Sequence, residues 1–465
     1  MSQSESHQTR QFWALLAGPI VACLATVLML FYFPDGTAQA ITLGITVWVV
    51  VWWVFEPVPI PIASLVPLAL LPMMGILTPK ELGAAYGSPL VLLLLGGFIL
   101  ATALEKSGAH RRLAIAMVRA FGGSSSRRLV FGFMAASAVL SMWISNTATV
   151  IMLLPVAMAV ISNTSDEGLA TPLLLGIAYA ASIGGMGTPI GTPPNVVFMG
   201  VYQEFTNETI SFATWMSYAI PIVLVLLPIA GFWITRNLAH QENVTLPEVG
   251  QWSVAEKRVF IVFSLTALAW VTRSEPFGGW STWFNVPFTN DAIVAFLGVL
   301  VLFVTPNGEG GKLLDWETAN KIPWGMLLLF GAGIAIASAF MNSGLGAQIG
   351  QGLQALSTLP LLLMIATICL AVTFLTEVTS NTATTTLLMP IFAAAALGAA
   401  IDPKLFMIPA ALSASCAFML PVATPPNLIT FSTGRFPLAT MAREGLALNL
   451  LGALVISLAI YAMFS

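Results

Sequence analysis

The chain has 465 residues, of which 57% are hydrophobic and only 8% are charged, and its formal net charge is −3. Soluble domains carry roughly 25% charged residues, so this composition excludes a water-soluble enzyme, a disordered chain and a basic nucleic-acid-binding module. The three cysteines lie far apart and the three histidines form no cluster, which predicts neither a disulfide framework nor a metal centre. The composition predicts an all-α, polytopic membrane protein embedded in a lipid bilayer.

Apolar runs that end at charged residues, Pro or Gly predict the segments that cross the bilayer. A spanning helix needs about 20 mostly apolar residues. The runs of this kind are 12–32, 38–55, 57–75, 88–106, 212–235, 257–273, 288–305, 323–342 and 443–464. Four more apolar regions carry Ser, Thr, Asn, Gly or Pro in the middle: 128–161, 169–201, 359–399 and 406–433. We expect 169–201 and 406–433 to cross as broken helices, which gives about eleven transmembrane helices.

The regions 128–161 and 359–399 either cross the membrane or re-enter it as hairpins, and the positive charges decide between these arrangements. Lys and Arg concentrate on the cytoplasmic side of a membrane. With the N-terminus inside and both regions re-entrant, 14 of the 17 Lys and Arg residues are cytoplasmic, and Lys80, Arg273 and Lys404 are outside. With both regions crossing, the split is 10 to 7. The sequence therefore predicts two re-entrant hairpins, a cytoplasmic N-terminus and an external C-terminus.

The two halves of the chain contain three similar sequence segments in the same order. The matching pairs are LLLLGGFILATALEKSG (92–108) with LLLFGAGIAIASAFMNSG (327–344), SNTATVIMLLPVA (145–157) with SNTATTTLLMPIF (380–392), and GTPPNVV (191–197) with ATPPNLI (423–429). Between the two hairpins lie five predicted spans, an odd number, so the second copy must be inverted. Inverted repeats with broken helices are typical of secondary transporters, whose binding site lies near the bilayer midplane.

The repeats predict how the chain is organised. In order, the predicted parts are a tail and first helix (1–37), a first repeat (38–235), a cytoplasmic linker (236–256) and a second repeat (257–465). Residues 108–127 interleave apolar and basic side chains, which predicts an amphipathic helix in the cytoplasmic interface, and 344–357 occupy the same place in the second half.

The break points can hold ions without charged side chains. A hairpin tip leaves free N–H groups where one helix begins and free carbonyls where the other ends, and this suits an anion beside a hard cation. The paired prolines of the Thr-Pro-Pro-Asn elements break the helix and free carbonyls around Gly191 and Ala423. No Lys or Arg lies at any break point. We therefore expect neutral donors to hold the anion and co-bound cations to neutralise it.

Glu377 is the only acid close to a break point, three residues before Ser380. Ionisable residues inside a membrane are functional by default, which favours a proton relay. A carboxylate capped by the nearby hydroxyls of Thr376 and Thr379 would instead be structural. The sequence leaves both roles open.

At these residues the chain resembles the divalent anion:sodium symporter family along its whole length. SMWISNT (141–147), TEVTSNT (376–382) and the two PPN elements match the family's signature. The resemblance implies a homodimer whose protomers each have a scaffold domain and a mobile transport domain that work as an elevator. It also implies sodium as the coupling ion, two or more per cycle, and no organic cofactor.

The resemblance further implies which residues bind the ions and the substrate. The first sodium site would use Ser141, Ser145, Asn146 and Gly191, and the second would use Thr376, Thr379, Asn381 and Ala423. The substrate carboxylates would be held by Asn146, Thr147, Thr192, Asn381, Thr382, Thr424 and Pro425. Thr192 stands where related dicarboxylate carriers have Ser, and Thr382 keeps a hydroxyl that citrate-preferring relatives tend to replace by Val. The extra methyl of Thr192 bears on fine selectivity, and the hydroxyl of Thr382 favours four-carbon diacids over citrate.

Together these features predict a secondary active transporter, not an enzyme, that imports a C4-dicarboxylate (succinate, malate or fumarate) with sodium across a bacterial inner (cytoplasmic) membrane. The alternatives on the same fold are a sodium-independent dicarboxylate exchanger and a symporter of sulfate or another divalent anion. A channel or a non-transporting receptor is a further alternative, and the lack of rings of charged residues argues against a channel.

Overall fold

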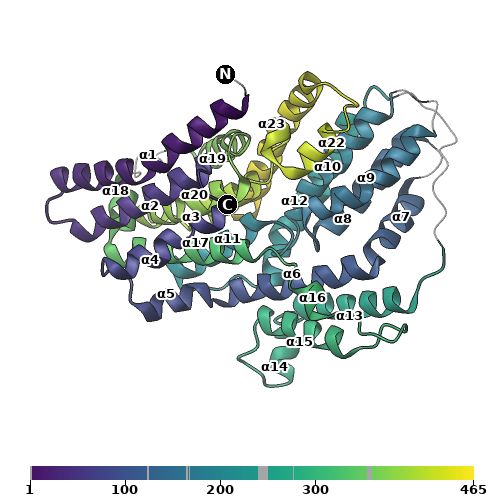
Figure 1. Cartoon of the computed structure of the whole chain (residues 1–465), viewed down its shortest axis with the longest axis horizontal. Helices are drawn as coiled ribbons and strands as arrows, with labels where there is room; N and C mark the ends of the chain where they lie inside the picture. Colours follow the sequence, from purple (N-terminus) through teal and green to yellow (C-terminus); the bar gives the residue numbers. More distant parts are fainter. Residues whose placement is uncertain are drawn as a thin grey trace.

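The computed structural model describes residues 3–122, 125–163, 166, 168–238, 250–275, 277–352 and 359–464. The described residues form α-helices joined by mostly short loops, and no β-strand occurs among them (Figure 1). This all-helical architecture agrees with the fold class that the composition predicts.

The helices of the two halves follow one another in a similar order. The first half contains α1 (Gln3–Tyr32), α2 (Thr37–Phe55), α3 (Ile60–Ala63), α4 (Leu65–Met73), α5 (Pro79–Tyr86), α6 (Pro89–Ser107), α7 (Ala109–Gly122), α8 (Ser126–Ser141), α9 (Asn146–Ser162), α10 (Ala170–Gly185), α11 (Pro193–Thr206) and α12 (Phe212–Ile234). The second half contains α13 (Val254–Val271), α14 (Gly279–Trp283), α15 (Asp291–Val304), α16 (Trp316–Ala319), α17 (Trp324–Ser343), α18 (Leu345–Gly352), α19 (Leu361–Thr376), α20 (Asn381–Gly398), α21 (Lys404–Ser413), the 3-10 helix η2 (Pro421–Ala423), α22 (Pro425–Phe431) and α23 (Leu438–Phe464). The run from α6 to α12 thus has its counterpart in α17 to α23.

Each region with a Ser-Asn-Thr motif folds as two helices that meet at a short tip. Residues 142–145 separate α8 from α9, and residues 377–380 separate α19 from α20. Ser145 and Ser380 start the second helix of each pair. Each Ser Oγ accepts a hydrogen bond from the backbone N–H three residues later, at 3.1 Å in the first tip and 3.5 Å in the second. A side-chain oxygen at this position satisfies an N–H that the helix itself cannot, so the same residue fixes both tips.

The two interrupted spans stop and restart at the Thr-Pro-Pro elements. Residues 186–192 separate α10 from α11, and residues 414–424 separate α21 from α22. Thr192 and Thr424 are extended, and the two prolines after each Thr occupy the first turn of the new helix. Proline has no N–H to donate and fits only in that first turn, so the prolines set where the helix resumes.

Two predicted spans differ in the structure. The segment 57–75 forms α3 and α4, which are separated at Ser64. Pro67 follows three residues later and has no N–H to donate to the Ala63 carbonyl, so the helix cannot continue unbroken. The segment 288–305 shortens to α15, which begins after Asn290 caps its first turn.

Six helical segments of the described chain are long and apolar enough to cross a membrane: Trp13–Tyr32, Thr37–Phe55, Pro79–Ser107, Phe212–Ile234, Trp324–Ser343 and Leu438–Phe464. Among the shorter apolar helices are limbs of the two hairpins and helices that flank the breaks. Such short helices do not span ~30 Å of hydrocarbon at 1.5 Å per residue. The segments next to them in the chain must therefore cover the rest of the distance. The chain is a multi-pass membrane protein.

The predicted amphipathic segment 108–127 forms α7, which packs against α8. Its second-half counterpart, 344–357, contains α18, and its last residues, from 353 onward, lie outside the described residues. The predicted linker 236–256 also lies largely outside them, at 239–249.

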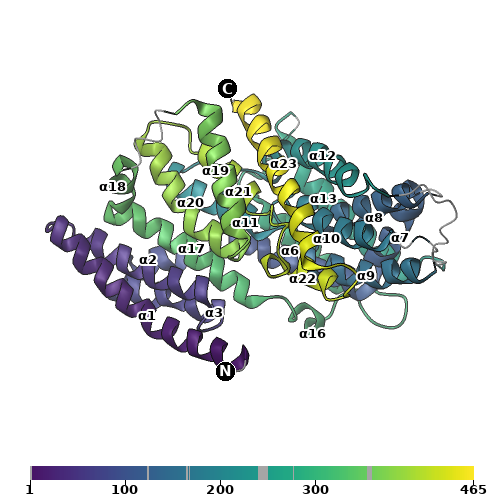
Figure 2. The same ribbon diagram turned by 90° about the horizontal axis from the view of Figure 1, so that it is seen from above.

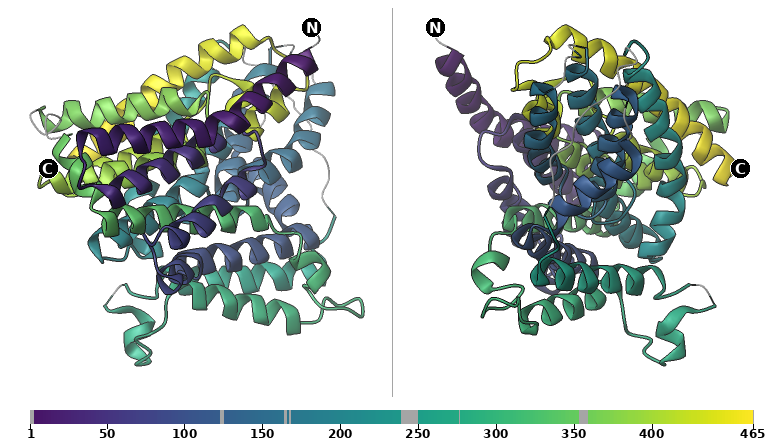
Figure 3. Two further views of the ribbon diagram at one scale, coloured as in Figure 1. Left: turned by 60° about the vertical axis from the view of Figure 1, so that its left-hand side comes forward. Right: turned by 90° about the vertical axis from the view of Figure 1, so that its right-hand side faces the viewer.

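The two halves interlock around the break points. α22 contacts both α9 and α10, and α11 contacts α20 and α21, so helices of one repeat pack on those of the other. At one edge α1 packs along α2 (Figure 2). Large apolar side chains of α1 are exposed, among them Phe31 at 78%. On another side α13 and α15 lie together against α6 (Figure 3).

Polar contacts join helix ends that are distant in the sequence. Two groups that form a hydrogen bond or an ion pair near a membrane surface must lie at the same surface. The contacts are Lys106 with Asp315, Arg112 with Glu256, Arg127 with the Thr235 carbonyl, Arg236 with Glu444, Asn342 with Glu81, and Lys404 with Glu208.

Candidate functional site

A cavity of about 650 Å³ lies where the two hairpin tips meet the two breaks. From the tips, the lining residues are Trp143, Ile144, Ser145, Asn146, Thr147, Val378, Thr379, Ser380, Asn381 and Thr382, and from the breaks and the helix starts after them they are Ile190, Gly191, Thr192, Pro193, Val422, Ala423, Thr424, Pro425 and Pro426. The opposite wall comes from α2, α6 and α17, through Val54, Glu56, Leu94, Gly97, Phe98, Ala101, Pro323 and Met326. Four elements far apart in the sequence thus contribute polar groups to one cavity.

The structure brings the predicted site residues together around this cavity. All seven predicted substrate residues line it. Of the eight predicted sodium residues, Ser145, Asn146, Gly191, Thr379, Asn381 and Ala423 line it as well. Ser141 and Thr376 are instead fully buried behind the tips.

Around the first tip, neutral oxygens converge. The Ser141 hydroxyl donates to Asn146 Oδ1. A Cβ placed on Gly185 would lie 2.7 Å from Asn146 Oδ1 and 3.2 Å from the Gly191 carbonyl oxygen. These oxygens therefore face a space that exists because residue 185 has no side chain. Unwound carbonyls and side-chain oxygens of this kind are what sodium sites in transporters use.

The second tip repeats this arrangement with different side chains. The Thr376 hydroxyl lies 2.6 Å from Asn381 Oδ1 and 3.1 Å from the Ala414 carbonyl oxygen. The Thr379 hydroxyl donates to the Leu375 carbonyl at 2.8 Å and lies 2.5 Å from Thr384 Oγ1. The Asn that starts the second helix of the hairpin thus has its oxygen held by a hydroxyl in both repeats.

At both breaks, the Asn of the Pro-Pro-Asn element forms hydrogen bonds to carbonyls at the interruption. Asn195 Nδ2 donates to the carbonyls of Gly185 at 3.0 Å and Thr188 at 2.7 Å. Asn427 Nδ2 donates to the carbonyls of Ala417 at 2.9 Å and Leu420 at 3.0 Å. Carbonyls freed by an unwound segment need such partners at membrane depth, so these two buried amides stabilise the non-helical chain.

The cavity carries little charge of its own. Among the described residues that line it, Glu56 is the only charged one, and no Lys or Arg is present. Glu56 ends α2 in a left-handed conformation with φ 45°, and its N–H donates to the Trp52 carbonyl at 3.0 Å. An anion in this cavity would meet neutral donors and helix N-termini, and a cation would be attracted by the carboxylate.

Sequence reasoning missed several residues of the site. Glu56 lies in an apolar run before Pro57 and Pro59, and an isolated acid at that place was the available signal. Trp143 lies inside the first tip and packs against Phe212, Phe263 and Trp270, with ring centroids 5.4 to 6.5 Å apart. Nothing in the local sequence indicates this aromatic cluster, because its members come from the first tip, α12 and α13.

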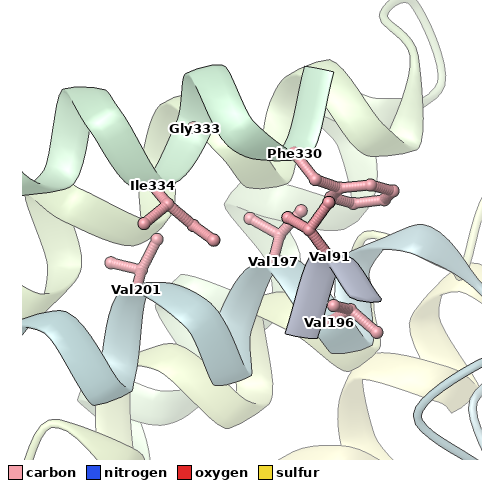
Figure 4. Close-up of a pocket in the computed structure, with 7 residues that line it drawn as sticks. All are labelled: Val91, Val196, Val197, Val201, Phe330, Gly333 and Ile334. Atoms are coloured by element: carbon pink, nitrogen blue, oxygen red, sulfur yellow. The ribbon is translucent and has the colours of Figure 1, made fainter. Parts of the chain in front are cut away.

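Two other cavities lack the groups to bind a dianion. A void of about 10 Å³ between α6, α11 and α17 is lined by apolar side chains, including Val197, Val201 and Ile334 (Figure 4). A cavity of about 510 Å³ beside α7 and α13 is lined almost entirely by apolar residues, with His110 and Ser264 as exceptions. A third cavity, of about 320 Å³ between α5, α11 and α17, is polar, but its charged lining residues are the acids Glu81 and Glu204, which repel a dianion. The cavity at the tips is the candidate binding site.

Comparison with known proteins identifies the family of the chain. The model of the sodium:sulfate symporter transmembrane region matches residues 9–464. A protein of Staphylococcus saprophyticus named sodium-dependent dicarboxylate transporter SdcS is 39% identical over 99% of this chain and 92% of its own length. The SdcS of Staphylococcus aureus strain MRSA252 is 38% identical over 97% of this chain and 91% of its own.

Solved structures share the fold at low sequence identity. The YdaH transporter of Alcanivorax borkumensis superimposes with a TM-score of 0.61 at 16% identity, over 84% of this chain and 89% of its own. MtrF of Neisseria gonorrhoeae superimposes with a TM-score of 0.58 at 14% identity, over 84% of this chain and 83% of its own. These likenesses establish the fold alone. The family match and the near full-length relatives show more: the chain belongs to the sodium:sulfate symporter family, the divalent anion:sodium symporters, whose members are transporters and not enzymes.

Proposed function

We propose that this protein is a sodium-coupled carrier that imports C4-dicarboxylates such as succinate, malate and fumarate. The observation that carries the proposal is the central cavity, in which two Ser-Asn-Thr tips and two Thr-Pro-Pro elements converge and no Lys or Arg is found among the described lining residues. The name of the SdcS relatives, which match along nearly their whole length, supports sodium and a dicarboxylate as the transported species.

The paired tips suit a molecule with two carboxylates. Asn146 and Thr147 come from the first tip, and Asn381 and Thr382 from the second, so each tip offers an amide and a hydroxyl to one end of a diacid. Both tips also begin a helix, whose free N–H groups favour an anion. Thr382 keeps the hydroxyl that we associate with diacids rather than citrate.

Sodium would supply the positive charge that the side chains lack. A dianion needs two sodium ions to be neutralised, and a third makes transport respond to the membrane potential, at ~2.3 kcal/mol per charge and 100 mV. The oxygens around Asn146 and Asn381 are shared between the proposed ion sites and the substrate site. Binding of sodium should therefore raise the affinity for the diacid, and the diacid should raise the affinity for sodium by the same factor.

The contacts between helix ends support re-entrant hairpins, and the distribution of Lys and Arg supports a cytoplasmic N-terminus. If 128–161 and 359–399 crossed the membrane, all residues between them would change sides relative to the rest of the chain. The pairs Arg127–Thr235, Arg112–Glu256 and Asn342–Glu81 would then have to join opposite surfaces, so their contacts favour the hairpin arrangement. The same pairs lie at common surfaces in the hairpin arrangement, which also makes the two repeats inverted.

We further propose that the protein works as an elevator in a homodimer in the cytoplasmic membrane. The apolar contact between α11, which follows the first break, and α17, which faces the tips across the cavity, supports a sliding interface (Figure 4). Apolar contacts have no fixed direction, so helices can shift along them at low cost.

Uptake of radiolabelled succinate into proteoliposomes tests the proposal. An inward sodium gradient should drive accumulation that potassium or choline gradients do not. Uptake only into succinate-loaded vesicles, without a need for sodium, would instead identify an exchanger. The name of the family makes sulfate the second candidate, so sulfate should be tried as a competitor and as a labelled substrate. Sodium-driven sulfate uptake that succinate does not inhibit would overturn the dicarboxylate assignment.

A further inference from the structure

We propose that the cavity beside α7 and α13 binds one acyl chain of an anionic phospholipid, whose headgroup is held by Arg111 and Lys257. The cavity has a volume of about 510 Å³. It lies behind the first tip, because Trp143 and Ile144 line both this cavity and the candidate binding site. This lipid site goes beyond the proposed function and does not depend on which substrate is transported.

One wall of the cavity follows α13. The lining residues on this helix are Phe260, Phe263, Ser264, Ala267, Leu268 and Val271. From Phe260 to Val271 the helix rises about 16 Å at 1.5 Å per residue. No charged residue occurs from Val259 to Thr272, as expected for a stretch that lies in hydrocarbon. The cavity therefore extends along the predicted span 257–273.

The lining of the cavity suits a hydrocarbon chain better than water. Its other walls are contributed by α6, α7, α8 and α12, through Leu104, Ala109, His110, Leu113, Val139, Leu140 and Met216. A buried water needs two to four polar partners, and apolar cavities stay dry. Apart from Ser264 the main polar group is the His110 ring, and its Nδ1 is already bonded to the Leu104 carbonyl at 2.8 Å. A chain of methylene groups gains apolar contacts along the whole wall.

The cavity is open toward the bilayer along α13. Leu268 lines it and is nevertheless 58% exposed, and Phe260 and Val271 are also exposed. Side chains that line a cavity and remain exposed mark its opening. The surroundings of an uncharged stretch of a spanning helix are lipid tails, so the opening admits an acyl chain.

Basic residues predominate where α13 begins. Within four positions of a lining residue of α6, α7 or α13, this end of the cavity has the acids Glu105 and Glu256 and the basic residues Lys106, Arg111, Arg112, Lys257 and Arg258. Three of the basic residues have protein partners: Arg112 pairs with Glu256, Lys106 with Asp315, and Arg258 donates to the Pro306 carbonyl.

Arg111 and Lys257 are left to bind an external anion. Both are exposed, and neither forms an ion pair within the part of the chain that the structure describes. Arg111 follows the lining residue His110, and Lys257 precedes Phe260 by three positions, which places it on the same face of α13. Basic pockets between transmembrane helices bind anionic lipid headgroups. A phospholipid therefore satisfies the apolar cavity and its basic end together.

A bound chain would pack against the side of the first tip that faces away from the candidate binding site. Its contacts with Trp143 and Ile144 should stabilise the tip. Since a ligand that binds only the folded protein raises its stability, the lipid should also raise the thermal unfolding midpoint.

Lipid retention in native mass spectrometry and thermal unfolding, both of the full-length protein in detergent, test this inference. The probes are phosphatidylglycerol, which is anionic, and phosphatidylcholine with the same acyl chains, which has no net charge. Ala267→Phe fills the cavity. Leu265→Phe is its matched control, because Leu265 is on the same helix, is 60% exposed and does not line the cavity.

A second pair of variants tests the headgroup. Arg111→Gln and Lys257→Gln remove the charges and leave the cavity open. Arg435→Gln is their control, because Arg435 is exposed in the turn between α22 and α23.

We expect wild type to bind phosphatidylglycerol at least about tenfold more tightly than phosphatidylcholine. Arg111→Gln and Lys257→Gln should each lower the affinity for phosphatidylglycerol about fivefold, the effect of one basic residue near a charged lipid surface. Ala267→Phe should lower the retention of both lipids at least about tenfold, since the loss of about two buried methylenes already has this effect. Phosphatidylglycerol should raise the unfolding midpoint of wild type and of both controls, but not that of Ala267→Phe.

Three results would overturn the inference. An Ala267→Phe protein that retains phosphatidylglycerol as Leu265→Phe does would exclude the cavity as the site. Equal retention of the two lipids by wild type, or charge variants that behave like Arg435→Gln, would exclude the headgroup contact. A wild-type protein that retains neither lipid would exclude both. If Ala267→Phe does not fold, the charge variants decide, because they leave the interior unchanged. Neither readout involves transport, so the result is independent of the proposed function.

Discussion

Because Gly185 has no side chain, there is space beside the oxygens of the first tip. An alanine Cβ there would lie 2.7 Å from Asn146 Oδ1 and 3.2 Å from the Gly191 carbonyl oxygen. Gly185→Ala should therefore block the first ion site and raise the sodium requirement for uptake at least about tenfold, since each tenfold loss of affinity is only about 1.4 kcal/mol. Gly83→Ala is the control, because a Cβ at Gly83 meets nothing within 4 Å. Unchanged sodium dependence of uptake in Gly185→Ala would show that no sodium ion binds at this place.

The proposed site gives each of the two tip asparagines a role in binding an ion and a role in binding the substrate. The oxygens of Asn146 and Asn381 are held by the hydroxyls of Ser141 and Thr376, and both asparagines line the cavity. Asn146→Ala and Asn381→Ala should each lower uptake at least about a hundredfold, because a shared ligand of two coupled species is lost. Thermal unfolding and elution as a single species should stay close to wild type. Normal uptake in either folded variant would contradict the site.

At the scale of elements, each break depends on one amide. Asn195 donates to three carbonyls, those of Gly185, Met186 and Thr188, and it is fully buried. Asn195→Ala should destabilise the protein by about 2–4 kcal/mol, because buried carbonyls lose their donors.

Asn163→Ala is the control for Asn195→Ala. It removes a single exposed hydrogen bond, to the Ala159 carbonyl, and should change the free energy of unfolding by less than about 0.5 kcal/mol. The unfolding midpoints of both variants in detergent provide the measurement. A midpoint for Asn195→Ala equal to that of Asn163→Ala would show that the break does not rely on this amide.

Elements could be predicted from the sequence where a local signal defines them. Ser145 and Ser380 cap their own helices, and the paired prolines set where α11 and α22 begin, so both tips and both breaks follow from neighbouring residues. The interruption at Ser64 has a local signal as well, because Pro67 follows three residues later, although the hydropathy of 57–75 alone predicts one span.

The same distinction holds for the candidate site. Its polar side was evident from the two repeated motifs. Its opposite wall, including Glu56, depends on which helices pack together, as do the hydrogen bonds that Glu377 accepts from the Met419 and Leu420 N–H groups, and no short stretch of sequence contains that information.

At the scale of the whole molecule, the contacts between helix ends restrict which surface each loop can occupy. Lys106 pairs with Asp315, so the loop before α16 must share a surface with the end of α6. With the N-terminus inside, re-entrant hairpins place Lys312 in the cytoplasm, whereas crossing hairpins would place it outside. Lys80 is outside in both arrangements. The side chains of Lys80 and Lys312 are both exposed.

This difference gives a direct test of the topology. Lys80→Cys and Lys312→Cys are made separately in a background in which the exposed Cys23 is replaced by Ser. In intact cells a membrane-impermeant maleimide should label Lys80→Cys and leave Lys312→Cys unlabelled, and permeabilised cells should show both labelled. Labelling of Lys312→Cys in intact cells would mean that the Ser-Asn-Thr regions cross the membrane. The contacts that join Lys106 to Asp315 and Arg112 to Glu256 would then have to be wrong, and with them the arrangement in which both tips reach one cavity.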